Sequence, residues 1–273
     1  MSSAIETARS TAAIRARETR RPDRLFADPW AELLAGDITA DESPNVVIRT
    51  RFFDEFLAHA TSDSDCDAAI HQVVVVGSGM DTRAFRQSWP EGTHLYELDR
   101  PEVLERKDRL LWDAGARPAC ERHSVGVDLI EGWTDALEQA GFDRTTPSVW
   151  LAEGFLVYLE EPHVRGLQLD FSRLAARASR LGLDVPNRAF LTSPWTKPTI
   201  EMMRERGTPY RFAIDRPEEL LTELGWAAKV TVLGDTAANY GRWPYPVAPR
   251  ETPGVPSGLL VTATRLDATD PGP

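Results

Sequence analysis

Acidic residues recur at the ends of four predicted strands, where they could bind an amine or a sugar hydroxyl. They are Asp81, Asp99, Asp128 and Glu153. One acid at a strand end is most often a helix cap, but four at successive strand ends are difficult to assign to capping alone. Because ligands of open α/β sheets bind along the carboxyl edge, we expect these carboxylates to surround one site. A ligand with an amino group, ribose hydroxyls and an adenine amine would use such acceptors.

The first of these strands, four valines at 73–76, runs directly into the turn Gly77-Ser78-Gly79. Four consecutive β-branched residues indicate a strand that is buried on both faces, as in the middle of a parallel sheet. The two glycines would allow a tight turn and a close approach of the backbone to a ligand. Asp99 lies 20 residues after Gly79, which is the spacing of a ribose-binding acid in a nucleotide-binding βαβ unit.

The glycine turn departs from the dinucleotide fingerprint at its third position. Gly-x-Gly-x-x-Gly would place a glycine where Thr82 stands. That glycine serves close helix packing beside a pyrophosphate, so its absence favours an adenosine ligand without one. S-adenosylmethionine, with S-adenosylhomocysteine as its product, is the predicted cofactor. An NAD-dependent oxidoreductase and a turn without any ligand are the alternatives.

Composition narrows the class of protein. The chain has 273 residues, a formal charge of −11 and a mean hydropathy of −0.34. The negative charge disfavours nucleic-acid and anionic-membrane partners, and no window approaches the roughly 20 apolar residues of a membrane span. The two cysteines, Cys66 and Cys120, give no sign of a zinc or disulfide framework. We therefore expect a cytoplasmic protein without a metal.

The pattern of the chain predicts an α/β fold of four parts: a Rossmann-like sheet of seven strands with N-terminal helices and an inserted cap. The parts are a helical arm and lid (1–66), a cofactor-binding α/β core (67–185), a substrate cap insertion (186–214), and a helix with strands that complete the sheet (215–273). Later strands are predicted at 94–98, 121–127, 148–152, 180–185, 226–233 and 258–265. Helices are predicted at 46–60, 102–114, 133–139, 162–178 and 216–224.

Some local features carry predictions of their own. Residues 2–20 are expected to form a mobile or lid-like helical arm. Asp28 is predicted to cap a helix that has Pro29 in its first turn, and Asp81 to begin the helix after the glycine turn. The tail at 267–273 is expected to be disordered. In the helix at 46–60, Arg49 and Arg51 could form a solvated face or reach the carboxylate of a ligand.

In the order of these motifs, the chain resembles the leucine carboxyl methyltransferase-like family of S-adenosylmethionine-dependent methyltransferases. The resemblance covers about residues 15–265 and extends to the bacterial branch that includes polyketide O-methyltransferases. It is carried by Arg15-Ala16-Arg17-Glu18, Phe26-Ala27-Asp28-Pro29-Trp30, Arg49-Thr50-Arg51-Phe52-Phe53-Asp54, Gly77-Ser78-Gly79-Met80-Asp81-Thr82-Arg83, Glu97-Leu98-Asp99-Arg100-Pro101, Val127-Asp128-Leu129, Ala152-Glu153-Gly154-Phe155-Leu156-Val157-Tyr158-Leu159 and Leu224-Gly225-Trp226.

The resemblance implies a role for each part of a cofactor site. Arg49 would pair with the methionine carboxylate, and Glu153 would lie near the amino group. The remaining implied contacts are Gly77 and Gly79 along the methionine and ribose, Asp99 at the ribose hydroxyls, and Asp128 with Leu129 at the adenine. Arg15 or Arg17 would match the family's N-terminal basic residue.

The acceptor is predicted to be a carboxylate or hydroxyl oxygen of a small molecule. Tyr158 is implied at the substrate entrance, and with Glu153 it is a positioning candidate. Further substrate candidates in the cap are Trp195, Tyr210 and Arg211, with Arg188 beside them. The histidines His94, His123 and His163 are interpreted as structural, and the lack of an evident base favours a carboxylate. Methylation of a peptide or protein carboxylate and cofactor binding without turnover stay as alternatives, and the oligomeric state is open.

Overall fold

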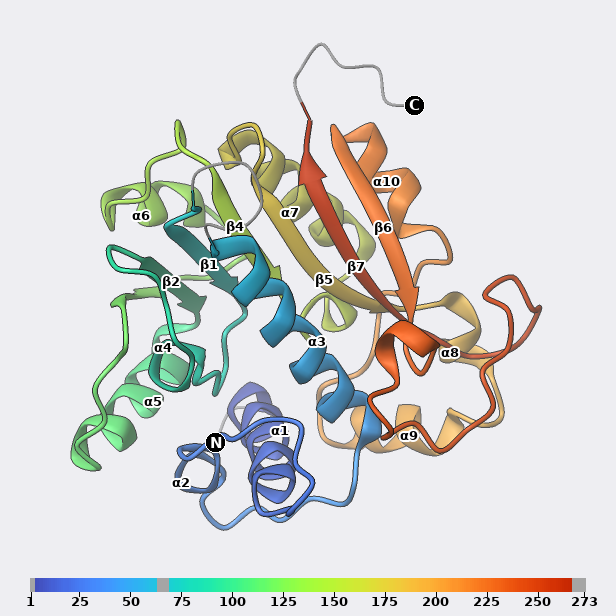
Figure 1. The fold of residues 1–273 in the computed structure, drawn as a ribbon. Coiled ribbons are helices and arrows are strands. Elements are labelled where there is room, and N and C mark those ends of the chain that lie inside the picture. The colour runs from blue at the N-terminus through green and yellow to red at the C-terminus, as the bar shows by residue number, and fades with distance from the viewer. Residues whose placement is uncertain (1–2, 63–68, 267–273) are drawn as a thin grey trace.

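The computed structural model describes residues 3–62 and 69–266, which form a seven-stranded sheet with helices on both faces (Figure 1). The spatial order of the strands is β3-β2-β1-β4-β5-β7-β6. Strands β1 to β5 run parallel to their neighbours, whereas β7 is antiparallel to β5 and β6. The strands are β1 (Gln72–Val76), β2 (His94–Asp99), β3 (Glu121–Gly126), β4 (Ser148–Ala152), β5 (Arg180–Pro186), β6 (Trp226–Val232) and β7 (Gly258–Arg265). The predicted fold class is confirmed.

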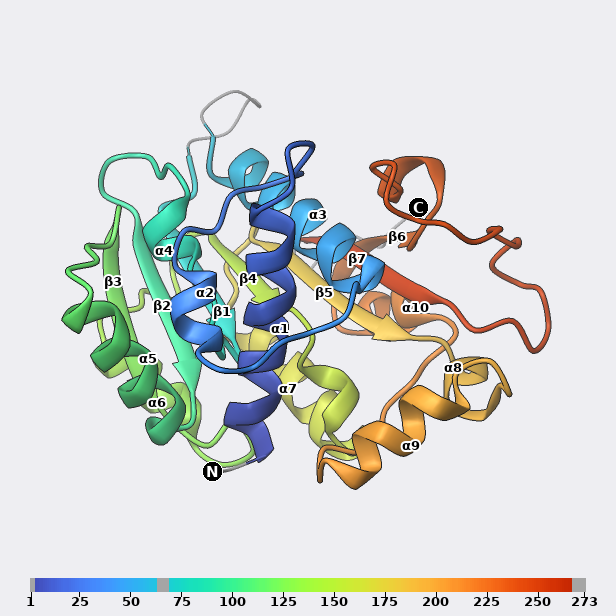
Figure 2. The same ribbon diagram turned by 90° about the horizontal axis from the view of Figure 1, so that it is seen from below.

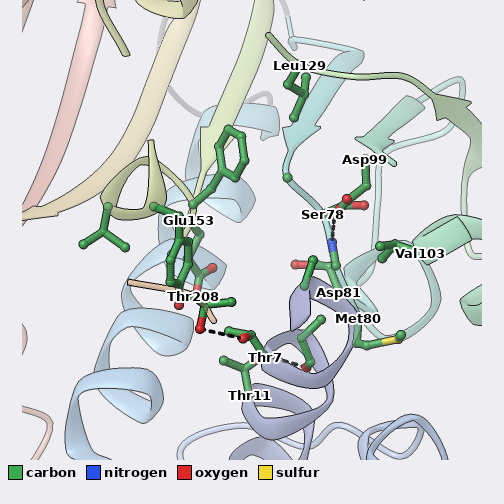
Figure 3. A pocket seen from close by; sticks show the side chains of 18 of the residues that line it. Thr7, Thr11, Ser78, Met80, Asp81, Asp99, Val103, Leu129, Glu153 and Thr208 are labelled. Carbon is green, nitrogen blue, oxygen red and sulfur yellow. Dashed lines mark hydrogen bonds between the residues drawn. The ribbon is translucent and has the colours of Figure 1, made fainter. Parts of the chain in front are cut away.

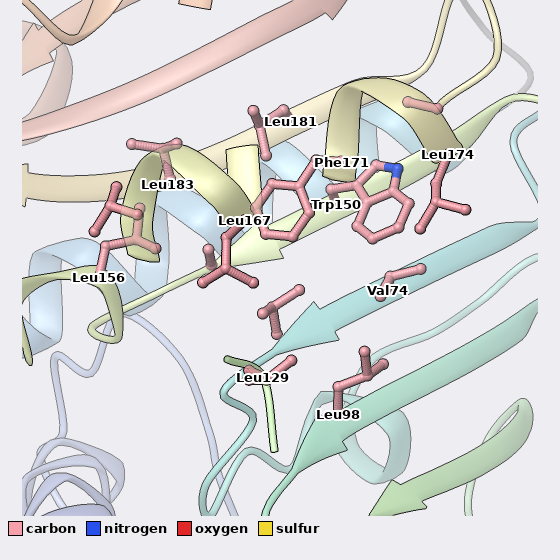
Figure 4. Packing of buried hydrophobic residues seen from close by; sticks show 14 of the residues in the cluster. Val74, Leu98, Leu129, Trp150, Leu156, Leu167, Phe171, Leu174, Leu181 and Leu183 are labelled. Carbon is pink, nitrogen blue, oxygen red and sulfur yellow. The ribbon is translucent and has the colours of Figure 1, made fainter. Parts of the chain in front are cut away.

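The valine strand β1 lies between β2 and β4, as its double-sided hydrophobic pattern predicted. All five of its residues are buried. Val74 faces one core with Trp150 of β4 and Phe171 of α7 (Glu161–Leu174), and Figure 4 labels all three residues. Val73 and Val75 face the opposite core, so the strand contributes to both layers.

Helices cover the two faces of the sheet in separate groups. On one face lie α6 (Trp133–Gln139), α7 and α10 (Pro217–Glu223), whose apolar side chains share a core with the sheet. On the other lie α3 (Pro44–Thr61) and α4 (Arg83–Arg86), while α5 (Pro101–Asp113) packs beside β3. No described helix is long and apolar enough to cross a membrane.

The N-terminal helices cross the carboxyl ends of the strands. Figure 2 shows α1 (Ser3–Thr19) over the ends of β1 and β4, with α2 (Ala31–Ala35) beside it. Ala12 and Leu34 are fully buried where these helices meet. The predicted arm is therefore a helix packed over the sheet edge, in the position of a lid. Cys66 and the tail at 267–273 lie outside the described residues.

Three predicted helix boundaries were wrong. Helix α2 begins at Ala31 with Trp30 as its N-cap rather than at Pro29; the Asp28 carboxylate accepts a hydrogen bond from the Trp30 amide at 3.2 Å, in the turn before the helix, and another from Arg15. Helix α4 begins at Arg83 rather than Asp81, whose carboxylate accepts a hydrogen bond from the Arg83 amide. Helix α7 ends at Leu174 instead of 178, where Ala178 has a positive φ of 65° that a helix does not allow.

The predicted cap at 186–214 contains two short helices, α8 (Arg188–Thr192) and α9 (Lys197–Glu205). Its ends are held together by a hydrogen bond from the Ile214 amide to the Pro186 carbonyl at 3.0 Å. The segment then reaches the turn after β4, η1 (Leu156–Tyr158), where the Arg211 amide donates to the Val157 carbonyl. A further short turn, η2 (Thr236–Ala238), precedes β7. The cap is thereby fixed beside the sheet edge, and its contact with substrate stays a prediction.

Candidate active site

A cavity of about 520 Å³ opens at the carboxyl ends of β1 to β4, beneath α1. In Figure 3, Asp99 and Leu129 lie on one side of it, while Glu153 and Thr208 lie on the other, with the threonines of α1 between. The four acids that the sequence placed at successive strand ends all line this cavity. The prediction that these four carboxylates lie around one site is confirmed.

The glycine turn forms the floor of the cavity and requires glycine at both positions. Gly77 and Gly79 have positive φ values of 64° and 50°, which side chains disfavour. A Cβ on Gly77 would lie 2.5 Å from the ring of Phe155, and one on Gly79 would lie 3.2 Å from Ala8. The Gly77 and Ser78 amides donate to the Leu98 carbonyl, which anchors the turn to β2.

Asp99 is joined directly to the glycine turn. Its carboxylate accepts hydrogen bonds from the Gly79 and Arg100 amides, each at 2.7 Å. Burial raises the pKa of Asp99, an effect that the two amides reduce without cancelling. Each carboxylate oxygen keeps further acceptor capacity, so Asp99 can hold the turn and still receive the hydroxyls of a ligand.

The loop after β3 supplies an apolar side chain and an acid to the cavity. Leu129 is buried, whereas Asp128 is exposed and accepts a hydrogen bond from the Ile130 amide at 3.0 Å. Val103, from the start of α5, lines the same part of the cavity. An apolar wall beside an acceptor suits a flat ring that carries an amine, as the resemblance implied.

Arg49 lies at the other end of the cavity, and it is not part of a solvated face. Its guanidinium donates to Glu153 and to Asp184, both at 3.1 Å. Burial opposes the charge, but Asp184 and Glu153 outweigh it and keep the pKa of Arg49 above its ordinary value. Arg51, the other arginine of the predicted pair, is half-exposed and forms an ion pair with Glu55. The structure thus separates two arginines that the sequence left equivalent.

Glu153 also contacts Arg83 at 2.7 Å, which links the cofactor side of the cavity to its floor. Burial disfavours ionisation of Glu153, but Arg83 and Arg49 overcome that effect and lower its pKa. The carboxylate is therefore charged at neutral pH. A fixed negative charge beside a fixed positive charge matches the amino and carboxylate groups of an amino acid.

Two tyrosines and an ion pair surround the outer part of the cavity. The rings of Tyr158 and Tyr210 meet edge to face with centroids 5.5 Å apart, and Arg211 pairs with Glu160 beside them. All four line the cavity. Trp195 does not: it is 74% exposed and lies outside the lining. Arg188 is likewise exposed and outside the lining.

Sequence reasoning missed the contribution of α1. Thr7, Ala8 and Thr11 line the cavity, and Thr7 forms a hydrogen bond at 3.3 Å with Thr208, just beyond α9. In the sequence, only the spacing of three and four residues indicates that they share one face of a helix. The pattern is weak because the residues are small. Arg15 from the same helix also lines the cavity and pairs with Asp28 at 2.8 Å, whereas Arg17 is exposed.

The fold of the chain is similar to that of solved methyltransferases. A solved structure of a methyltransferase candidate from Thermobifida fusca is 16% identical, with a TM-score of 0.57, and the alignment covers 95% of this chain and 94% of that one. Geranyl diphosphate C-methyltransferase from Streptomyces coelicolor, solved with Mg²⁺, geranyl diphosphate and S-adenosylhomocysteine, is 12% identical with a TM-score of 0.52; coverage is 93% and 87%.

Sequence comparison assigns the family. The model of leucine carboxyl methyltransferase matches residues 8–169. A candidate S-adenosylmethionine-dependent methyltransferase from Saccharopolyspora erythraea is 39% identical, covering 95% of this chain and 94% of the relative. Another from Streptomyces coelicolor is 36% identical, with 95% of both chains covered. The chain belongs to the leucine carboxyl methyltransferase family, and its cofactor is S-adenosylmethionine.

The residues of the cavity fit that cofactor. The Ser78 hydroxyl is buried in the lining and has no hydrogen-bond partner within residues 3–62 and 69–266. It can therefore form a hydrogen bond with a ligand. Together with Arg49 and Glu153 for an amino acid and Asp99 for a ribose, this hydroxyl matches the polar parts of S-adenosylmethionine. The individual residue roles stay predictions.

Proposed function

We propose that this methyltransferase acts on an oxygen atom of a small-molecule acceptor, with a carboxylate as the preferred group. The proposal rests on the outer part of the cavity, which Tyr158, Tyr210 and Arg211 line. Hydroxyl and guanidinium groups donate hydrogen bonds, and a negatively charged oxygen is the acceptor that such donors recognise best.

A carboxylate needs no catalytic base, because its ordinary pKa near ~4 leaves it ionised at neutral pH. Bound S-adenosylmethionine supplies the methyl group: the acceptor oxygen forms an O–C bond as the C–S bond breaks, and S-adenosylhomocysteine leaves. The protein contributes mainly alignment and exclusion of water. Residues of α1 line one side of the cavity, and the helix thereby helps to exclude water.

Tyr158 is suited to orient the acceptor rather than to deprotonate it. Burial is the main cause that raises the pKa of Tyr158 well above its ordinary value, and burial also raises that of Tyr210. Both hydroxyls therefore keep their protons at neutral pH. A protonated phenol can donate to one carboxylate oxygen while the other attacks.

A hydroxyl acceptor is the second candidate, and the position of His163 favours it. A phenol has an ordinary pKa near ~10 and benefits from a base within hydrogen-bond reach. His163 is exposed on α7 and lines the outer part of the cavity, which the sequence did not predict. Loss of His163 would then affect hydroxyl substrates and spare carboxylates.

The volume of the cavity supports a small acceptor. About 520 Å³ lies within the roughly 300–1,000 Å³ of small-molecule sites, and cofactor and acceptor must share it. Of a peptide, only the terminal carboxylate group could enter the cavity. Polyketide and other secondary-metabolite acids therefore form the first group of compounds to screen.

The test is transfer of a labelled methyl group to matched panels of carboxylic acids and phenols. A methyl ester releases its label in mild alkali, whereas a methyl ether does not. We expect alkali-labile product, and a loss of about tenfold in kcat/KM for Tyr158→Phe, the scale of one hydrogen bond to a charged group. Tyr245→Phe, at an exposed tyrosine, is the matched control. Exclusively alkali-stable product would reject the carboxylate.

A further inference from the structure

A cluster of two histidines and a glutamate lies at the sheet edge opposite the cavity. His94 begins β2, and Glu121 begins the edge strand β3, with the two Cα atoms in register. His123 follows two residues later on β3 and therefore projects from the same face as Glu121. Parallel pairing of the two strands brings the three side chains together at their amino ends, away from the strand ends that carry the cofactor site.

The three potential ligand atoms form a nearly equilateral triangle. His94 Nδ1 and His123 Nε2 are 3.3 Å apart, and Glu121 Oε1 is 3.5 Å from each of them. The glutamate distances exceed the ~2.7–3.2 Å of ordinary hydrogen bonds. The carboxylate oxygen therefore lies within ion-pair range of both imidazoles without a close hydrogen bond to either.

The triangle has the dimensions of one face of a metal tetrahedron. An ion bound tetrahedrally at about 2.0–2.1 Å separates its ligand atoms by about 3.3–3.5 Å. Two imidazoles and a carboxylate are a ligand set of zinc and other late first-row cations. We propose that His94, Glu121 and His123 bind a divalent transition-metal ion, with Zn²⁺ as the representative.

The surroundings support an ordered site with one open position. The ring of His123 stacks on the buried Tyr96 with centroids 4.6 Å apart and an interplanar angle of 14°. The side chains of His94, His123 and Glu121 are 39%, 23% and 62% exposed, so water can complete the tetrahedron. A bound ion would fasten the edge strand β3 to β2 without entering the methyl-transfer site.

Titration of untagged, chelator-treated full-length protein with Zn²⁺ tests the proposal. We expect one ion per chain with a Kd in the micromolar range or below. His94→Ala and His123→Ala should each weaken binding at least tenfold, and Glu121→Gln should weaken it measurably. His163→Ala, at the opposite edge of the sheet, is the matched control and should bind Zn²⁺ as the parent does.

Two further measurements keep the test decisive if a histidine variant unfolds. Co²⁺ bound to the parent should give the strong visible absorption of a tetrahedral site, and Glu121→Gln should change it. Zn²⁺ should also raise the Tm of the parent while leaving its affinity for S-adenosylhomocysteine unchanged. Stoichiometric Zn²⁺ binding that survives in a folded His94→Ala/His123→Ala variant would overturn the proposal. A Kd of the parent weaker than about 100 μM would overturn it as well, because exposed acids bind Zn²⁺ adventitiously at that level.

Discussion

Arg83 joins three parts of the active site through one buried guanidinium. Its side chain is only 3% exposed and contacts Asp54 of α3, Asp81 of the glycine turn and Glu153 after β4. Removing one partner of such a network leaves charge that is buried without compensation. We therefore interpret Arg83 as the residue that fixes the relative positions of the turn and the strand end.

The contact with Arg83 makes stability depend on pH through Asp81. Burial alone would raise the pKa of Asp81, but Arg83 and Arg86 outweigh it and lower the value to about 2 from 3.8. A depressed pKa in the folded state stabilises the protein above the unfolded pKa, and that stabilisation is lost as the pH falls from about 4 towards 2.

Asp81→Asn should therefore lower the free energy of unfolding by on the order of 2 kcal/mol at pH 6. The difference from the parent should shrink steadily between pH 4 and pH 2.5, because the parent carboxylate becomes protonated there. Urea unfolding across this range measures it, with Asp135→Asn on the exposed surface of α6 as the control. A difference independent of pH would contradict the assignment.

Residue chemistry was predictable where a local pattern carried it. Each of the four acids lies at the end of a recognisable strand or within a few residues after it, and the sequence found all four. Asp28 accepts hydrogen bonds from Arg15 and from Thr82, which lies 54 residues further along the chain, and so joins three segments. No local pattern predicts such a contact. Trp195 was misplaced for a related reason: an aromatic residue in a cap does not reveal which side it faces.

Among the elements, α1 shows how a weak pattern can hide a functional face. The sequence predicted a helix and a lid, but its small residues gave little sign of which side is buried. In the structure Thr7, Ala8, Thr11 and Arg15 line the cavity at helical spacing. Strand positions were predicted more closely, because β1 and β4 are continuous runs of buried residues, whereas the ends of α2 and α7 depend on tertiary contacts.

The close approach of α1 to the glycine turn gives a prediction at this scale. Ala8→Leu should push side-chain atoms against Gly79, because a Cβ added at Gly79 would already lie only 3.2 Å from the Ala8 Cβ. Overpacking of this kind costs roughly 1–3 kcal/mol, so we expect affinity for S-adenosylhomocysteine to fall about tenfold by calorimetry. Ser10→Leu, on the same helix but outside the cavity lining, should have little effect. Equal losses in both variants would indicate a general disturbance of α1.

The whole molecule carries its chemistry at the carboxyl edge of one sheet, and the elements that line the cavity come from distant parts of the chain. Helix α1, the ends of β1 to β4 and the segment around Thr208 all contact the same space. A ligand that fills the cavity therefore binds the folded chain and not the unfolded one. Such a ligand must stabilise the entire fold by mass action.

S-adenosylhomocysteine at about 100 times its Kd should stabilise the protein by about 2.7 kcal/mol. For a chain of this size each kcal/mol shifts Tm by about 2–4 °C, so we expect a rise of about 5–10 °C in a thermal melt. NADH at the same concentration should leave Tm unchanged, since Thr82 stands where a pyrophosphate site needs glycine. Asp99→Ala should remove most of the shift, because Asp99 supports the Gly79 amide and the ribose position together. A shift with NADH, or one that Asp99→Ala preserves in full, would mean that the ligand is held by a different part of the cavity from the glycine turn.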